Sequence, residues 1–274
     1  MEPDHLPDKG LNAELPTGGR RPEALPGHWL LASLGKRVLR PGGARMTEQL
    51  LDRAELTGAH VVELAPGLGL TARSILSRKP ASYTGVEADP QAAALVRKAI
   101  AAGGTCVVAD AGATGLPADT ADVVLGEAVL TMQSATTKRR IVAEAVRLLK
   151  SGGRYAIHEL ALVPDNVADV IVTDIRTSLA RAMKVNARPL MIKEWRELLS
   201  DAGLTVESVD TAPMTLLQPR RMVADEGLSG TLRFVRNVAT QPDARSRVLE
   251  MRRVLTRHKD SLAAVSIVAR RTRL

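Results

Sequence analysis

The segment that most constrains the fold covers residues 61–72, where an apolar run passes through a glycine-containing turn into a helical pattern. Two adjacent valines open the segment and favour a buried strand, with Glu63 near its end. Gly67 and Gly69 let the backbone come close to a ligand where a Cβ atom would collide. The N–H groups of a helix N-terminus and the carboxyl end of a strand meet at such a turn, which therefore predicts a site for a nucleotide-like cofactor.

Strand and helix patterns alternate along the chain around this turn. We expect strands at residues 60–64, 82–87, 105–109, 122–126, 154–158, 205–210 and 263–269. Helical spacing is found at residues 71–78, 90–102, 135–149, 170–183 and 192–202. This alternation predicts an α/β fold in which helices cover both faces of a mostly parallel sheet.

Helical regions flank the alternating part. Leu30, Leu34 and Val38 have the spacing of a first lead-in helix, and a second follows the Pro41-Gly42-Gly43 break. A helical excursion before the last strand is the candidate for a cap over the site. We expect a disordered or loosely docked arm (1–27) followed by one domain (28–274). Within the domain, the expected parts are lead-in helices (28–56), a cofactor-binding core (57–162), substrate-side helices (163–204) and the last two strands (205–274), with a basic insertion at about 218–260.

Charge is distributed unevenly along the chain. The net charge is +8, and residues 218–274 hold 13 Lys and Arg against 5 Asp and Glu, which accounts for the whole excess. Such a section can face nucleic acid, an acidic lipid surface or an anionic substrate, or it can be a solvated arginine-rich helix surface. The single cysteine, Cys106, excludes an intrachain disulfide framework and indicates a reducing compartment, expected to be the cytoplasm. No run approaches the roughly 20 apolar residues of a membrane span, so none is predicted.

The glycine turn alone does not decide which cofactor binds. Gly67, Gly69 and Ala72 also satisfy the dinucleotide pattern, and Glu87 stands where the ribose-binding acid of an NAD site would be. Glu63 favours S-adenosylmethionine instead, because a carboxylate at the strand tip attracts the cationic end of that cofactor and would repel a pyrophosphate.

Two later segments agree with this preference. The third expected strand ends in Asp110-Ala111, where a carboxylate can accept a hydrogen bond from the adenine amine and the next N–H can serve a ring nitrogen. A fourth strand at residues 122–126 leads to Glu127, and Gly152-Gly153 precedes the fifth.

With these ordered motifs the chain resembles the class I S-adenosylmethionine-dependent methyltransferases, similar to the ubiquinone and menaquinone methyltransferase group. The resemblance covers about residues 56–162 and, more loosely, the last strand. It implies a doubly wound, seven-stranded, Rossmann-like sheet ending in an antiparallel pair, with N-terminal helices and a helical insertion before the last strand. It also implies S-adenosyl-L-methionine as cofactor, S-adenosyl-L-homocysteine as product and a small-molecule acceptor as partner.

The resemblance assigns roles to particular residues. Those that it places around the cofactor are Glu63, Ala65, Pro66, Gly67, Gly69, Glu87, Ala88, Asp110, Ala111 and Glu127. Ala65 departs from the pattern, since the family usually has glycine at this position, and Pro66 often corresponds to a cysteine. No metal ligand set is predicted.

A general base is needed only where the acceptor loses a proton. The candidates at carboxyl ends of strands are Glu127, His158 and Glu159. The alternatives are a structural histidine bonded to a backbone carbonyl, and a Glu159 that caps a neighbouring loop. His28 and Trp29 are expected either to close over the cofactor or to plug the first helix, and Met132 and Gln133 are expected either to line the acceptor site or to pack in the core.

Other functions stay open. A nucleic-acid methyltransferase is the nearest alternative because of the basic section, but no Asn/Asp-Pro-Pro-aromatic motif follows the fourth strand and Phe234 is the only aromatic residue of that section. A non-catalytic S-adenosylmethionine-binding protein is a second alternative. An NAD-dependent oxidoreductase is disfavoured because no Tyr-x-x-x-Lys pair accompanies the turn. A homodimer is also left open.

Overall fold

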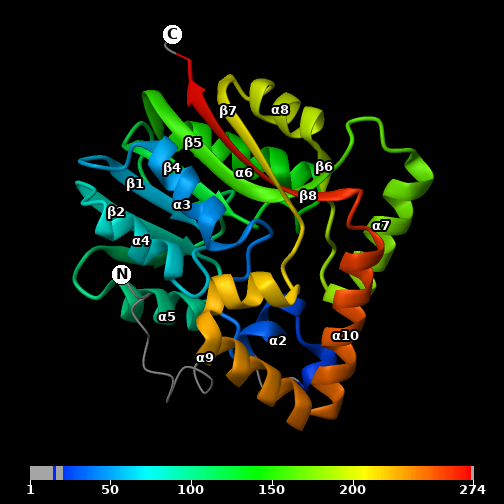
Figure 1. Ribbon diagram of the computed structural model, residues 1–274. Helices are drawn as coiled ribbons and strands as arrows, with labels where there is room; N and C mark the ends of the chain where they lie inside the picture. The colour runs from blue at the N-terminus through cyan, green and yellow to red at the C-terminus, as the bar shows by residue number, and fades with distance from the viewer. Residues whose placement is uncertain (1–14, 17–20, 273–274) are drawn as a thin grey trace.

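Figure 1 shows the computed structural model, which describes residues 15–16 and 21–272. Most of the expected arm at residues 1–27 lies outside the described residues. In its described part, Leu15 and Leu25 are buried, and a short 3-10 helix, η1, spans Pro22–Ala24.

One sheet forms the centre of the fold. Its strands run in the order β3-β2-β1-β4-β5-β8-β7, with the two-residue β6 paired to β5. Strands β1 to β5 are parallel to one another, and β8 is antiparallel to both β5 and β7. This arrangement confirms the predicted Rossmann-like, mostly parallel sheet. The strands are β1 (His60–Leu64), β2 (Ser82–Glu87), β3 (Thr105–Val108), β4 (Ala121–Glu127), β5 (Leu149–Leu162), β6 (Leu190–Met191), β7 (Leu204–Pro213) and β8 (Leu262–Arg271).

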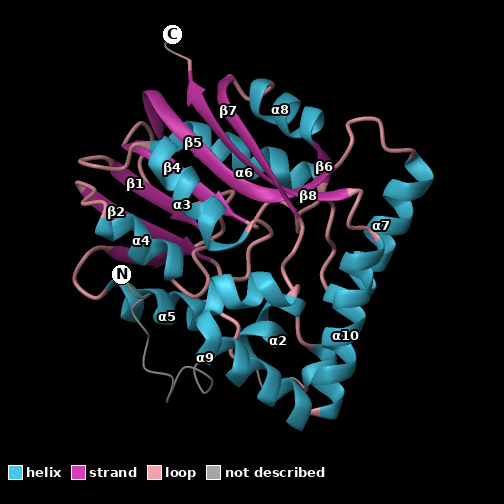
Figure 2. Cartoon of the chain, viewed as in Figure 1, coloured by secondary structure: helices cyan, strands magenta, loops and turns pink. Residues whose placement is uncertain are grey.

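Helices cover both faces of the sheet (Figure 2). Because successive strand side chains point to opposite faces, Val61 and Val123 pack with α3 (Gly43–Ala54), α4 (Leu70–Ser77) and α5 (Pro90–Ile100). Their neighbours Val62 and Val124 pack with α6 (Ala135–Leu148) and α8 (Ile192–Ser200) on the other face. Apolar strands buried on both sides are expected for a parallel sheet.

The remaining helices form a separate apolar cluster beyond one end of the strands (Figure 1). They are α2 (Gly27–Ser33), α7 (Asp169–Met183), α9 (Pro219–Thr240) and α10 (Pro242–Arg257). Helices α9 and α10 lie between β7 and β8, which confirms the predicted helical insertion before the last strand. Within the described part of the chain, no helix is both long and apolar enough to span a membrane.

Several element boundaries differ from the sequence-based prediction, and two of these differences affect residues near the predicted site. The first lead-in helix ends at Ser33, because Gly35 adopts a left-handed φ of 99°, so Val38 is not helical. Strand β5 begins directly after α6 and continues to Leu162, four residues beyond its expected end. The longer strand places His158 in the interior of the sheet rather than at its edge.

Candidate functional site

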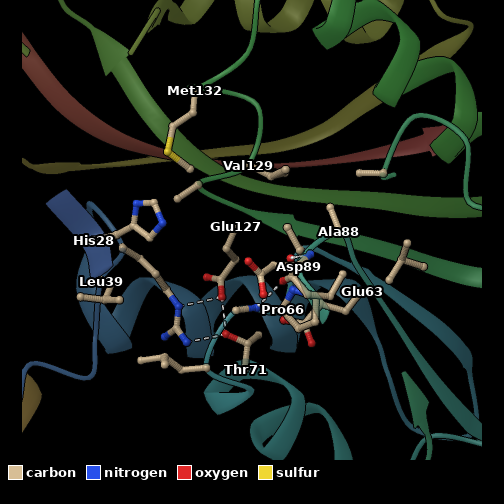
Figure 3. A pocket seen from close by; sticks show the side chains of 18 of the residues that line it. His28, Leu39, Glu63, Pro66, Thr71, Ala88, Asp89, Glu127, Val129 and Met132 are labelled. Atoms are coloured by element: carbon tan, nitrogen blue, oxygen red, sulfur yellow. Dashed lines mark hydrogen bonds and ion pairs between the residues drawn. The ribbon is translucent and has the colours of Figure 1, made fainter. Parts of the chain in front are cut away.

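A cavity of about 350 Å³ opens at the carboxyl ends of the parallel strands. Its walls come from α2, the loop before α3, the turns after β1 and β2, the loops after β3 and β4, and the start of α6 (Figure 3). Five acidic residues line it, and four of them come from the ends of four adjacent strands: Glu63, Glu87, Asp110 and Glu127. The fifth, Asp89, stands two residues after Glu87. Residues far apart in sequence thus meet at the edge where α/β folds bind their ligands.

The turn after β1 has three residues in left-handed conformations. They are Ala65, Gly67 and Gly69, with φ values of 54°, 58° and 72°. A Cβ atom on Gly67 would meet nothing within 4 Å, and Gly67 lines the cavity with Ala65 and Pro66. A Cβ atom on Gly69 would lie 2.8 Å from the Ala99 Cβ atom of α5. Gly69 therefore allows α4 and α5 to pack closely and does not line the cavity.

Glu63 is a buried carboxyl group with one side-chain donor. The Tyr83 hydroxyl donates to its Oε2 atom over 2.6 Å, and the residue is 2% exposed. Burial raises the pKa of Glu63 to about 8, although the hydrogen bond from Tyr83 acts in the opposite direction. A cation that enters the cavity would favour the ionised form, since opposite charges attract strongly in a poorly solvated site.

Glu87 and Asp110 are both held by backbone N–H groups, and Asp110 also by an arginine side chain. The Glu87 carboxylate accepts hydrogen bonds from the N–H groups of Gly67 (3.1 Å) and Asp89 (3.3 Å), and burial raises its pKa. Asp110 accepts a bond from Gly112 N–H (2.7 Å) and pairs with Arg140 over 3.0 Å. Each carboxylate therefore faces the cavity in a defined orientation.

The adjacent Ala88 and Ala111 also line the cavity. They stand directly after Glu87 and Asp110, so small side chains follow both oriented carboxylates. The structure thus gathers nine of the ten predicted cofactor residues around one cavity, with Gly69 just outside it.

Glu127 occupies a different electrostatic environment at the end of β4 (Figure 3). Its Oε2 atom lies 2.9 Å from Arg40 Nε and accepts the Thr71 hydroxyl over 2.5 Å. Its Oε1 atom accepts the Thr47 hydroxyl over 2.5 Å and lies 2.8 Å from His158 Nδ1. Burial alone would raise the pKa of this carboxyl, but Arg40 and His158 hold it at about 2. Glu127 is therefore ionised and fully engaged by the protein.

His158 lies fully buried in β5, and both of its ring nitrogens are used. The Gly42 N–H donates to Nε2 over 3.0 Å, so the proton resides on Nδ1 and is donated to Glu127. The ring does not line the cavity. This placement does not fit the catalytic role that the sequence suggested, because β5 extends past the residue and the segment before α3 covers it.

Glu159 is likewise fully buried and does not line the cavity. It accepts the N–H groups of Leu130 (2.8 Å) and Thr131 (2.9 Å) and the Thr131 hydroxyl (2.6 Å). Burial raises its pKa to about 7. The geometry agrees with the alternative in which Glu159 caps the loop after β4.

The side of the cavity opposite the glycine turn is largely apolar. His28 and Trp29 of α2 line it, with ring centroids 4.9 Å apart, and Leu39 and Met132 are also among its lining residues. His28 points toward the cavity in Figure 3. Burial lowers its pKa to about 4, so the imidazole is neutral at pH 7.

Arg40, Thr47 and Thr71 are site residues that the sequence reasoning missed. Arg40 and Thr71 line the cavity, and all three contact Glu127. Thr71 directly follows the predicted glycine turn, so its position in the sequence could have identified it as a site residue. Arg40 directly precedes the Pro41-Gly42-Gly43 break and Thr47 follows it, and neither belongs to such a motif.

Comparisons with known proteins agree with this geometry. Residues 62–157 match the family model described as "Methyltransferase domain". A Haemophilus influenzae protein described as uncharacterized is 32% identical over 217 residues, covering 77% of this chain and 84% of its own.

Solved structures show the same fold at low identity. The MccD protein superposes with a TM-score of 0.69 at 18% identity, covering 86% of this chain and 100% of its own. Geranyl diphosphate C-methyltransferase from Streptomyces coelicolor A3(2), in complex with Mg²⁺, geranyl diphosphate and S-adenosyl-L-homocysteine, has a TM-score of 0.59 at 16% identity, covering 84% of this chain and 77% of its own.

Proposed function

The chain belongs to the class I S-adenosylmethionine-dependent methyltransferases, and from this premise we propose that it transfers the methyl group to a small-molecule acceptor. One observation carries the proposal: Glu63, Glu87 and Asp110 converge from three adjacent strands on one cavity that also has apolar walls. Family membership supports S-adenosylmethionine-dependent methyl transfer, and we infer the acceptor class and the residue roles from the lining of the cavity.

The residues present fit the cofactor. Glu63 would face its cationic methionine end, because this buried carboxyl has a hydrogen-bond donor but no cation of its own within bonding distance among the described residues. Glu87 would accept the two ribose hydroxyls, and Asp110 with Ala111 would read the adenine edge. Gly67 has no side chain, which leaves open space for the cofactor beside the turn. The bound cofactor supplies an activated methyl group on a sulfonium.

The protein contributes alignment and exclusion of water rather than an evident base. Glu127, His158 and Glu159 are each held by partners within the protein, so we assign them positioning roles. Well-aligned reactants gain on the order of 7–11 kcal/mol from proximity alone. Trp29, Leu39 and Met132 would surround the acceptor and keep water from the reacting methyl group.

The lining of the cavity supports a small acceptor. The cavity is bounded by α2 and by the loop before α3, which also supplies Arg40. The acceptor in the structurally similar Streptomyces enzyme is geranyl diphosphate, a small molecule, which is consistent with this acceptor class on the shared fold.

Calorimetric titration with S-adenosylmethionine, S-adenosylhomocysteine and NAD tests the site. We expect micromolar binding of the two adenosyl ligands and none of NAD. Glu87→Ala and Asp110→Ala should each weaken binding by about 1–3 kcal/mol through lost hydrogen bonds. Asp260→Ala, at an exposed carboxylate before β8, is the matched control and should bind normally.

Turnover is then followed as S-adenosylhomocysteine release across a panel of small acceptors and an RNA pool. Methylation confined to the small acceptors supports the proposal. Methylation of RNA alone would replace it, and tight adenosyl binding with no turnover on either would favour a non-catalytic binding protein.

A further inference from the structure

The outer side of α9 presents an apolar stripe to solvent. Leu228, Leu232 and Val235 are 70%, 69% and 56% exposed, and Ala239 is also exposed. These residues follow Gly227, whose φ and ψ of 70° and 175° interrupt the helix. Their spacing of four, three and four residues places all of them on one helix face.

The opposite side of α9 packs against the protein. Phe234 is buried in the apolar cluster that α2, α7 and α10 share, and Gly230 is also buried. The Asn237 side-chain amide donates to the Leu34 carbonyl of α2 over 3.1 Å. These contacts fix the rotation of the helix, so the stripe is held outward and makes little contribution to the core.

Exposed positive charge is concentrated on the same pair of helices, and Arg236 directly follows Val235 of the stripe. Six arginines of α9 and α10 are exposed, whereas Asp243 is the one exposed acidic residue of these two fully described helices. The exposed arginines are Arg220, Arg236, Arg245, Arg252, Arg253 and Arg257. Apolar side chains and cations together are the features that an interfacial helix uses on an anionic bilayer.

We propose that α9 docks on an anionic lipid surface, with Leu228, Leu232 and Val235 inserted between headgroups and with Arg236 and other exposed arginines of α9 and α10 paired with lipid phosphates. A second copy of the chain fits less well, because it would bring two faces of the same charge together. Nucleic acid would leave the leucines unused, and the buried Phe234 cannot stack on bases.

The segment of α9 that precedes the docking surface supports the wall of the cavity. Before the Gly227 interruption, the Glu226 carboxylate accepts the N–H groups of Arg37 (3.0 Å) and Val38 (2.9 Å) and pairs with Lys36 over 3.2 Å. Arg37 lines the cavity. One helix thus carries both the proposed lipid contact and the support of the cavity wall.

Vesicle sedimentation of the full chain tests the proposal. We expect binding to vesicles of equimolar phosphatidylcholine and phosphatidylglycerol, weaker binding at high salt, and little binding to phosphatidylcholine alone. The double variant L228D/L232D should bind anionic vesicles about tenfold or more weakly. Arg236→Glu should weaken binding about tenfold through charge reversal.

Val170→Asp is the matched control, since Val170 is 76% exposed on α7, outside the stripe. It should bind like the wild type. Thermal unfolding and S-adenosylhomocysteine titration of every variant show that the fold and the cofactor site are intact, so failure of docking is distinguishable from failure of the proposed function.

Three results would overturn the proposal. The first is absence of binding to anionic vesicles, and the second is equal loss of binding in the Val170→Asp control. The third is self-association, measured by sedimentation velocity, that L228D/L232D abolishes while vesicle binding is absent, which would assign the surface to a second copy.

Discussion

The ends of β1 and β4 place the same chemical group at the cavity in opposite electrostatic settings. These strands are neighbours, and each contributes a glutamate with little exposure, Glu63 or Glu127. The pKa of Glu63 is raised to about 8 by burial, with one hydroxyl donor beside it. The pKa of Glu127 is held at about 2, because the protein supplies Arg40 and three further donors despite the burial.

The difference distinguishes a carboxylate that is paired with side chains of the protein from a carboxyl group that is available to a ligand. Glu127 joins α3, α4, β5 and the loop before α3 around one charge. Among the residues that the structure describes, no cation lies within bonding distance of Glu63, and the more distant charge of Arg40 does not offset its burial. A cationic ligand would therefore stabilise its ionised form. Position at a strand end alone does not distinguish the two roles.

The largest expected effect comes from removing the cation of Glu127. Arg40→Met should lower the free energy of unfolding by about 3–5 kcal/mol, because a buried charge loses its partner. Urea denaturation at pH 7 measures the change. The double variant R40M/E127Q should recover much of the loss, since no unpaired charge remains.

Arg53→Met supplies the control for this comparison. Arg53 pairs with Asp210 at the surface over 2.9 Å, with both side chains substantially exposed. The Arg53→Met substitution should lower the free energy of unfolding by about 1 kcal/mol or less. A loss at Arg40 as small as that at Arg53 would show that Glu127 does not depend on its cation.

Glu63→Gln is expected to have the next largest effect, on ligand binding. Loss of the negative charge should weaken S-adenosylmethionine binding by about 1–3 kcal/mol. In the wild type at pH 7, binding should release protons, because a cationic ligand favours the ionised form of a group whose pKa is about 8. Titration in two buffers with different protonation enthalpies measures the release, which should vanish in Glu63→Gln and persist in Glu55→Gln.

The two glutamates also predict opposite pH dependences of stability. Folding lowers the pKa of Glu127 from 4.5 to about 2, so its contribution is present above pH 4.5 and is lost as the pH falls through that window. Folding raises the pKa of Glu63 from 4.5 to about 8, so its contribution is present below pH 4.5 and is lost as the pH rises toward 8. Glu63→Gln should therefore flatten the decline in unfolding free energy above pH 4.5.

His158→Ala should lower the free energy of unfolding by about 1–3 kcal/mol, because the Gly42 N–H and the Glu127 carboxylate each lose a partner. Urea denaturation measures this, and S-adenosylhomocysteine affinity should be unchanged. A large fall in turnover without loss of stability would instead return the residue to a catalytic role.

The smallest expected effect on stability is at the alanines that directly follow β1 and β4. Ala65 and Ala128 have φ values of 54° and 55°, which L-residues adopt at a cost. Ala65→Gly and Ala128→Gly should each stabilise the fold by about 0.5 kcal/mol, since relief of strain exceeds the greater freedom of the unfolded chain. Thermal unfolding compares them, and a clear loss at Ala65 alone would show that its methyl group has a packing role.

Local patterns made much of the fold and of the cofactor side predictable. The sheet strands, the glycine turn and the acids that follow them are encoded within short segments, so Glu63, Glu87 and Asp110 could be placed at one edge from strand order alone. The helical insertion also has a recognisable period.

The β4 side could not be predicted in the same way. Arg40, in the loop before α3, and Thr47, in α3, reach Glu127 across about 80 residues of sequence, and no motif marks either residue as its partner. His158 was misplaced because strand β5 continues beyond it, and strand length depends on pairing with β8 over its whole extent. Contacts that depend on tertiary packing leave no signal in a single sequence.

The two tryptophans give the native chain a built-in optical reporter. Trp29 lines the cavity, whereas Trp195 is fully buried and donates its indole N–H to the Leu160 carbonyl over 3.2 Å. No other tryptophan is present. A molecule entering the cavity therefore changes the surroundings of one emitter while the other serves as an internal reference, and occupancy can be followed by intrinsic fluorescence without a label.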